Sequence, residues 1–312
     1  MPATAPMKPR IVSLLPAATE LVCALGARGS LVGRSHECDF PDTIRHLPAL
    51  TAPEVDPVAS SAAIDAQVRA AVAAGRPLFR IDAAALRDLR PDVILTQAQC
   101  AVCAVSRAEL DAALAEWPGT PPQVVALNPS RFADLWKDFT AVAEALRLPD
   151  LGREWIVPHK ERVAEVITRV ASGVTRRPKV LALEWLDPLM SGGNWLPEMV
   201  ELAGGTSVLA QAGKHSPWID WESVRKEDPE VLVLLPCGFD LARTRSEAAS
   251  LVGLPGWKTL RAVRNGRVFV TDGNALFNRP GPRLVDSLES MAEMLHPTLF
   301  PPRHRGPGWQ PL

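Results

Sequence analysis

Short apolar runs alternate along the first half of the chain with segments whose apolar residues recur at helical spacing. Strands are predicted at 10–15, 31–34, 93–96 and 124–127, and helices between them at 19–25, 86–89 and 106–117. Thr19 is expected to cap the first helix and Gly26 to end it. Strands separated by helices in this way predict parallel βα units.

The pattern changes after residue 130. Helical spacing predicts one helix over 131–146 and a second over about 151–172, long enough to span roughly 30 Å. Pro158 lies inside the second helix and is expected to kink or interrupt it. The βα rhythm then restarts, with strands predicted at 180–184, 231–235 and 268–271 and helices at 197–203, 221–227, 245–252 and 283–295.

These elements predict an α/β protein with two lobes. We expect an N-terminal α/β lobe over 10–130, bridging helices over 131–173, a C-terminal α/β lobe over 174–296 and an irregular tail over 297–312. Ligands of such folds bind beyond the carboxyl ends of the strands. With two lobes, the expected ligand site is the cleft between them.

Composition narrows the class of protein. A content of 47% hydrophobic and 22% charged residues is typical of a globular chain, and the net charge of -1 gives no reason to expect nucleic acid as a partner. No run of about 18 apolar residues occurs, so we expect no membrane insertion. The N-terminal segment has no uninterrupted apolar stretch of the kind found in secretory signals. This predicts a cytoplasmic protein, with a periplasmic location as the alternative if a signal lies upstream.

Loops of unusual composition follow the predicted strands or lie next to them. They are PAATE (16–20), SHECDFP (35–41), TQAQCAVCAVS (96–106), EWLDP (184–188) with SGGNW (191–195), PCGFD (236–240) and DGNALFNRPGPR (272–283). Because strand ends gather at one edge of a parallel sheet, these loops are expected to converge on the cleft.

The order of several motifs carries a resemblance to a known family. LLPAATE, VGRSHECDFP, RPDVILTQ, MVELAGG, LLPCGF and FNRPGPRL follow one another between about residues 10 and 300. In this order they resemble the cobalamin-binding members of the class III substrate-binding proteins. The resemblance implies two Rossmann-like lobes joined by a long bridging helix. It also implies a non-catalytic protein that holds a corrinoid such as cobalamin, or a related tetrapyrrole, between the lobes.

The resemblance also implies which residues line the ligand site. They are Pro16, Ala17, Ser35, His36, Glu37 and Gln97 on the first lobe, and Trp185, Trp195, Phe277 and Arg279 on the second. Tryptophan faces suit a large planar macrocycle because they offer apolar area at low entropic cost. Arg279 is expected to face a polar group of the ligand.

Three further positions bear on the resemblance and on the partner. Leu276 stands where transport members often carry an aromatic residue. Transport members also carry an acidic residue on each lobe for docking on an ABC permease. Glu222 fits the second of these positions, but Ala84 stands at the first. An importer component with a missing signal is therefore an alternative to a cytoplasmic binder used for storage, delivery or sensing.

A metal-dependent protein is a further alternative. His36 can be a ligand to cobalt or to a small metal ion, or it can hydrogen-bond within its loop. Cys100 and Cys103 form a C-x-x-C, and Cys38 and Cys237 lie in other predicted site loops. These residues could meet around a soft metal ion, or the thiols could pack the loops as small apolar groups.

Catalysis and disulfides are not expected. Glu184, Asp187 and Asp272 are carboxylates suited to acid–base chemistry, but no nucleophile motif such as G-x-S-x-G accompanies them. We therefore expect no enzymatic activity. Five cysteines do not form a paired disulfide framework, and Cys23 is expected in the core. Arg283 is expected to pair with Asp286 at i+3.

Overall fold

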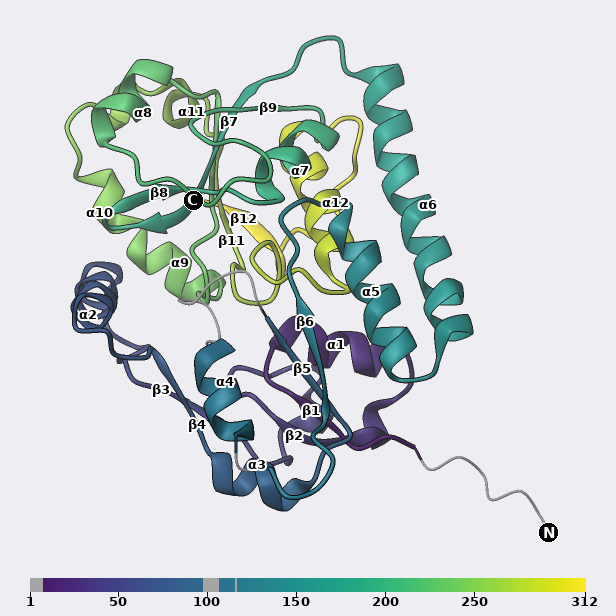
Figure 1. The fold of residues 1–312 in the computed structure, drawn as a ribbon. Helices are drawn as coiled ribbons and strands as arrows, with labels where there is room; N and C mark the ends of the chain where they lie inside the picture. Colours follow the sequence, from purple (N-terminus) through teal and green to yellow (C-terminus); the bar gives the residue numbers. More distant parts are fainter. Residues whose placement is uncertain (1–7, 98–106, 116) are drawn as a thin grey trace. The chain divides into compact units, whose positions relative to one another are not determined.

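The computed structural model describes residues 8–97, 107–115 and 117–312, and it has a mixed α/β architecture (Figure 1). The chain divides into two compact units and passes from one to the other at several points. Unit 1 contains the residues up to Val58, Ala66–Asn128 and Trp136–Ile156. Unit 2 contains Ala59–Asp65, Pro129–Leu135 and Val157–Leu312.

Unit 1 is built on a parallel sheet with the strand order β2-β1-β5-β6. Its strands are β1 (Ile11–Ser13), β2 (Leu31–Arg34), β5 (Val93–Gln97) and β6 (Gln123–Leu127). Val12 and Ile94 on one face of the sheet pack with Leu86 of α3 (Ala83–Leu89) and Leu110 of α4 (Arg107–Leu114). The four predicted strands of the first half are confirmed, and β1 and β5 are short runs of mostly buried apolar residues.

The first helix, α1 (Pro16–Ala24), begins three residues earlier than predicted. Pro16 occupies its first turn, where a missing N–H costs nothing and the fixed φ suits the helix. Thr19 is therefore inside the helix, and its hydroxyl donates to the carbonyl of Leu15 instead of capping the end. The short 3₁₀ helices η1 (Arg28–Ser30) and η2 (Asp42–Ile44) follow in the next loops.

A two-stranded antiparallel sheet and a helix in the first half were not predicted. Strands β3 (Thr51–Pro53) and β4 (Phe79–Ile81) pair antiparallel, and α2 (Ser61–Ala73) lies between them in the chain. The strands are three residues long, and α2 is rich in alanine, so neither has a strong apolar period.

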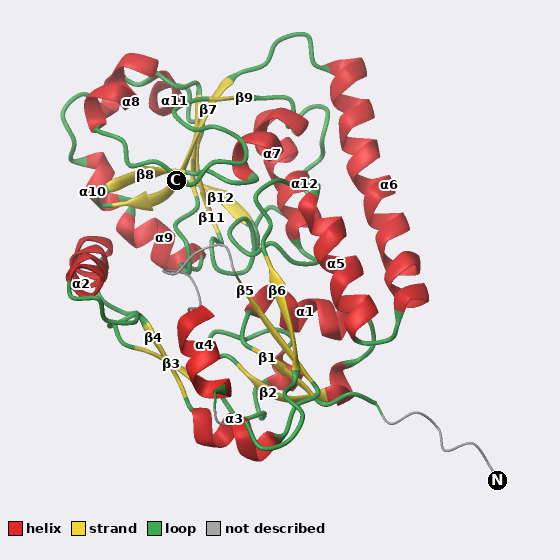
Figure 2. Cartoon of the chain, viewed as in Figure 1, coloured by secondary structure: helices red, strands yellow, loops and turns green. Residues whose placement is uncertain are grey.

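Unit 2 is built on the sheet β12-β11-β10-β7-β8, with β9 beside β7 and helices on both faces (Figure 2). Its strands are β7 (Lys179–Leu186), β8 (Leu189–Ser191), β9 (Thr206–Ser207), β10 (Val231–Leu234), β11 (Val268–Thr271) and β12 (Trp309–Pro311). Its further helices are α7 (Leu196–Leu202), α8 (Trp221–Glu227), α9 (Leu241–Glu247), α10 (Ala249–Val252), η3 (Trp257–Thr259), α11 (Arg261–Arg264) and α12 (Leu284–Leu295).

Alternation along the strands gives this sheet two apolar faces. Leu181 and Leu232 on one face pack with Val224 of α8, Leu251 of α10 and Ala262 of α11. On the other face α7 and α12 contact each other. The predicted strands of the second half are therefore confirmed in position, each with both faces buried as in other parallel sheets.

The end of the chain is more regular than the predicted irregular tail. Strand β12 pairs antiparallel with β11, and Trp309 is buried against Phe269 with the two rings perpendicular. The apolar area of this one buried tryptophan is enough to anchor a short edge strand. The strand was not predicted because the residues around it are mainly polar residues and prolines.

Two helices connect the units in sequence. They are α5 (Asp134–Ala145) and α6 (Pro149–Gly173), and Trp155 of α6 stacks on Phe139 of α5 at 3.9 Å between ring centroids. Pro158 does not interrupt α6, which is one helix of 25 residues, and a kink at this proline stays a prediction. Within the described residues, no helix combines the length and the apolar character needed to cross a bilayer.

Candidate ligand-binding residues in the two units

His36 lies in the loop after β2, and Thr51 of β3 holds it. The Thr51 Oγ1 atom is 2.7 Å from Nδ1 of the ring and accepts the backbone N–H of His36 at 3.0 Å. The Thr51 hydroxyl donates its single hydrogen to Ser35 Oγ at 3.0 Å. On this hydrogen-bond arrangement we assign the ring proton to Nδ1, which leaves the lone pair on Nε2.

The surroundings of His36 keep its ring neutral. Burial, together with the positive charge of Arg34, lowers the pKa of His36 below its usual value. Phe79 packs beside the ring at 5.7 Å between centroids. A neutral imidazole with Nδ1 hydrogen-bonded and Nε2 carrying a lone pair is the form in which histidine ligates a metal.

The other predicted residues of unit 1 lie at the carboxyl ends of neighbouring strands. Pro16 and Ala17 are buried in the first turn of α1, directly after β1. Ser35 is buried after β2 and accepts the N–H of Glu37, whose own side chain is exposed. Gln97 ends β5 and is half-buried. Because β2, β1 and β5 are adjacent, the structure brings these positions to one edge of the sheet.

The predicted cysteine cluster is only partly within the described residues, because Cys100 and Cys103 lie outside them. Cys38 is buried, and its sulfur receives the Thr19 hydroxyl at 3.0 Å. Cys237 is exposed in unit 2. The cluster therefore stays a prediction. Cys23 is half-buried rather than fully in the core, and burial raises the pKa of its thiol to about 11.

Three of the predicted residues of unit 2 lie in its interior. The Trp195 indole donates to the carbonyl of Phe277 at 2.7 Å, and Phe277 is fully buried. Arg279 is 7% exposed and donates to the Asn274 side chain at 2.9 Å. In this arrangement the three side chains support the loop that follows β11. Their role as direct ligand contacts stays a prediction.

Trp185 is the predicted residue of unit 2 that is not buried, and two unpredicted residues extend its aromatic surface. It lies half-buried near the end of β7, with the ring of Phe239 5.2 Å away. The guanidinium of Arg243, in α9, lies 3.6 Å from the centroid of Phe239, a cation–π contact. The sequence held no signal for this arrangement, since residues 185, 239 and 243 come from separate elements.

The carboxylates considered for catalysis have structural partners. Glu184 accepts the Ser216 hydroxyl at 2.7 Å, and Ser216 in turn accepts the N–H of Gly193 at 3.0 Å. Asp272 accepts the N–H groups of Asn274 and Ala275. These bonds fix loops after β7, β8 and β11, as expected of residues that shape a binding surface.

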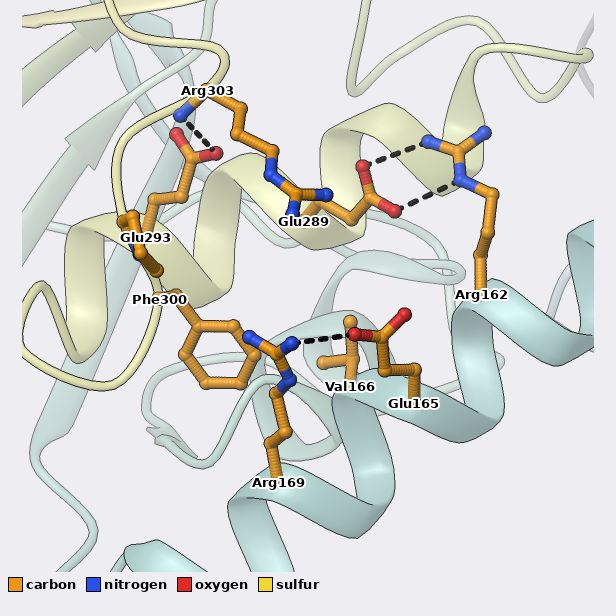
Figure 3. Close-up of a pocket in the computed structure, with 9 residues that line it drawn as sticks. Arg162, Glu165, Val166, Arg169, Glu289, Glu293, Phe300 and Arg303 are labelled. Carbon is orange, nitrogen blue, oxygen red and sulfur yellow. Dashed lines mark hydrogen bonds and ion pairs between the residues drawn. The ribbon is translucent and has the colours of Figure 1, made fainter.

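An ion cluster joins α6, α12 and the tail of unit 2, beside a small pocket (Figure 3). Arg162 of α6 binds both carboxylate oxygens of Glu289, at 2.9 and 2.7 Å, and Asp286 at 2.5 Å. His304 Nε2 lies 2.8 Å from the same Glu289 carboxylate. Asp286 pairs with Arg162 in the structure, and its predicted pairing with Arg283 stays a prediction.

Asp286, Glu289 and His304 are close enough together to be considered as metal ligands, but Arg162 already pairs with both carboxylates. Burial on its own would raise the pKa of Glu289. The hydrogen bonds from His304 and Arg162 outweigh burial and lower that pKa to about 2. The same bond to Glu289 raises the pKa of His304 against the opposite effect of burial. We therefore interpret the cluster as an internal ion network that holds the tail.

Comparison with known proteins decides the family. The family model described as "Periplasmic binding protein" matches residues 11–275. This chain belongs to that family. A vitamin B12-binding protein of Vibrio cholerae is 24% identical over 301 residues, which cover 92% of this chain and 88% of that protein. An uncharacterized ABC transporter substrate-binding lipoprotein of Bacillus subtilis, YvrC, is 20% identical over 295 residues, covering 93% and 81%.

Solved structures of this family have the same fold. The periplasmic heme-binding protein RhuT from Roseiflexus sp. RS-1, in its apo form, superimposes with a TM-score of 0.70 and 21% identity, covering 94% of this chain and all of that one. The class III fold expected from the sequence, with α/β lobes and a long bridging helix, is thereby confirmed. At the level of the family, ligand binding without catalysis is supported as well, since these relatives are named as binding proteins.

The expected cytoplasmic location is wrong for a member of this family. The family is described as periplasmic, RhuT is a periplasmic protein, and YvrC is a lipoprotein. The expectation rested on the lack of an uninterrupted apolar stretch in the N-terminal segment of the sequence, which is not enough to decide a location.

Proposed function

We propose that this periplasmic binding protein is the substrate-binding component of an ABC importer and that its ligand is a tetrapyrrole, a cobalamin in the first instance. The similarity to a vitamin B12-binding protein along 92% of the chain supports this ligand class. The likeness to a heme-binding structure extends the class to tetrapyrroles in general. The placement of the ligand in a cleft between the lobes stays a prediction from the sequence.

The observation that carries the proposal is the state of His36. Its neutral ring, with Nδ1 fixed on Thr51 and the lone pair on Nε2, suits an axial ligand to cobalt or iron at the centre of a macrocycle. The position directly after β2 is also where ligands bind in open α/β folds.

The aromatic surface around Trp185 supports the same ligand class. A half-buried indole next to Phe239 offers apolar area to a planar ring. Arg243 over Phe239 adds a positive charge, which suits the propionate, carboxamide or phosphate groups at the edge of a tetrapyrrole.

A permease is the proposed protein partner. Glu222 lies in the first turn of α8, where the resemblance implies a docking carboxylate. Its side chain is 75% exposed and forms an ion pair with Arg225 at 2.8 Å. An exposed carboxylate is available to a basic partner at little desolvation cost.

The experiment that tests the proposed function is an absorbance titration of the purified protein with hydroxocobalamin and, separately, with hemin. We expect a saturable shift of the cobalt-sensitive bands at micromolar protein, and its loss in His36→Ala. A shift that persists in His36→Ala would remove the axial role and keep the ligand. Absence of binding for both probes would refute the tetrapyrrole proposal.

A further inference from the structure

The seven residues Ala59–Asp65 belong to unit 2, although the chain before and after them belongs to unit 1. They include the start of α2, at Ser61. Three side chains of unit 2 bind this segment: Trp185 of β7, and Arg243 and Glu247 of α9. We call the segment Ala59–Asp65 the strap.

Glu247, at the end of α9, holds the first residue of α2. Its Oε2 atom accepts the Ser61 hydroxyl at 2.7 Å and the Ser61 N–H at 3.3 Å. The first N–H groups of a helix have no partner within the helix, and the helix dipole favours a negative charge at this end. The Glu247 carboxylate therefore accepts a free N–H group at the start of α2, as the side chain of an N-cap residue usually does. Ser61 is fully buried as a result.

The other two contacts attach the strap to the proposed ligand surface itself. The indole N–H of Trp185 donates to the Ser61 carbonyl at 3.2 Å, and also to its near neighbour Asp187 at 3.1 Å. Arg243 donates to the Ala59 carbonyl at 2.5 Å while its guanidinium lies over Phe239. The indole N–H of Trp185 and the guanidinium of Arg243 are thus both bound to the strap, which holds these two side chains of the proposed ligand surface in place.

We propose that the strap is a latch on the ligand surface of unit 2, and that it must release Trp185 and Arg243 before a ligand binds them. Glu247 is the main holding residue, because its charged contact with Ser61 is the strongest of the three. On release, Trp185 and Arg243 lose their hydrogen bonds to two backbone carbonyls of the strap and gain contacts with the ligand. The role in ligand binding rests on the proposed function, but the latch itself does not.

The test uses the full chain without ligand. Peptide-resolved hydrogen exchange measures how fast the backbone amides of the strap exchange. Hydroxyl-radical oxidation followed by mass spectrometry measures how accessible Trp185 is to solvent. In Glu247→Ala we expect roughly tenfold faster exchange in the strap, the effect of losing one charged hydrogen bond, and about twofold more oxidation at Trp185. Ser61→Ala keeps the backbone contacts, so it should increase amide exchange in the strap and oxidation of Trp185 by less than Glu247→Ala does.

Glu201→Ala is the matched control, because Glu201 is an exposed carboxylate of unit 2 in α7. Oxidation of the exposed Trp218 should be equal in all variants and serves as the internal reference. Unchanged exchange and unchanged Trp185 oxidation in both Glu247→Ala and Ser61→Ala would overturn the latch.

A stopped-flow arm with hydroxocobalamin and hemin then tests the link to binding. The association rate constant of the probe that binds should rise about fivefold or more in Glu247→Ala, since a larger fraction of molecules is ready to bind. An unchanged rate with increased Trp185 oxidation would overturn the gating role. If neither probe binds any variant, the proposed ligand class fails, while exchange and oxidation still decide whether the latch exists.

Discussion

The Thr51 hydroxyl contacts both Nδ1 of His36 and Oγ of Ser35, and it thereby orients the His36 ring. Groups that orient a metal-binding histidine typically change metal affinity by about 10- to 100-fold when they are lost. The role proposed for His36 therefore depends on a residue 15 positions away, on a strand that the sequence did not predict.

We expect Thr51→Val to weaken hydroxocobalamin binding by about tenfold, because the isosteric side chain keeps the packing but releases the ring. Thr51→Ser retains the hydroxyl and should bind within about twofold of the wild type. The measurement is the same absorbance titration. Equal affinities for the valine and serine variants would show that Thr51 does not position His36.

His304 should make the stability of unit 2 depend on pH. Its pKa is raised in the folded protein, so its bond to Glu289 contributes fully below the unfolded pKa of about 6.5 and is lost as the pH rises through the folded value. Glu289, with a pKa lowered to about 2, contributes above its unfolded pKa of about 4.3 and loses that contribution as the pH falls towards the folded value.

Between about pH 5.5 and 8.5 the wild type should therefore lose about 1 kcal/mol more unfolding free energy than His304→Gln. Urea unfolding at the two pH values measures the difference. The same pH dependence in both proteins would mean that another group is responsible.

At the scale of elements, α6 contains a locally unfavourable residue. Pro158 lies ten residues into a continuous helix, where it removes one backbone hydrogen bond and crowds the preceding turn. A proline at an interior position costs up to about 3 kcal/mol relative to alanine. The packing of α5 and α6, with Trp155 stacked on Phe139, gives the helix tertiary support that a sequence pattern does not include.

Pro158→Ala should accordingly raise the unfolding free energy by about 1–3 kcal/mol. Thermal unfolding followed by circular dichroism measures it. Glu161→Ala, at an exposed position in the same helix, should change stability by less than about 0.5 kcal/mol. A Pro158→Ala protein no more stable than the wild type would indicate that α6 bends around the proline at no cost.

The sequence predicted the parallel strands well, because runs such as VILTQ and VLVL are buried on both faces and have no other stable arrangement. It missed β3, β4 and α2, whose residues are few or small and whose place is set by tertiary packing. The burial of Trp195 and Phe277 inside unit 2 was not foreseen, since burial within one lobe cannot be deduced from a motif.

Contacts between residues far apart in the sequence could not be predicted from any sequence pattern. Trp185 and Ser61 are 124 residues apart, and Arg243 and Ala59 are 184 apart. No sequence pattern links the two members of either pair, so the contacts of the strap could be recognised only in the folded structure.

At the scale of the molecule, each unit has its own sheet and its own apolar core. Residues proposed to meet the ligand occur in both, with His36 in unit 1 and Trp185 in unit 2. The family places this chain among binding proteins, and the tetrapyrrole is the ligand class that we propose for it.

The most direct test of that ligand is isothermal titration calorimetry of the full chain with hydroxocobalamin, with hemin as the second titrant. We expect one cobalamin per chain with a dissociation constant of micromolar or below, about −8 kcal/mol or stronger. Tight binding of hemin alone would keep the tetrapyrrole class and change the proposed ligand. No heat of binding and no retained ligand for either compound would contradict the proposed function.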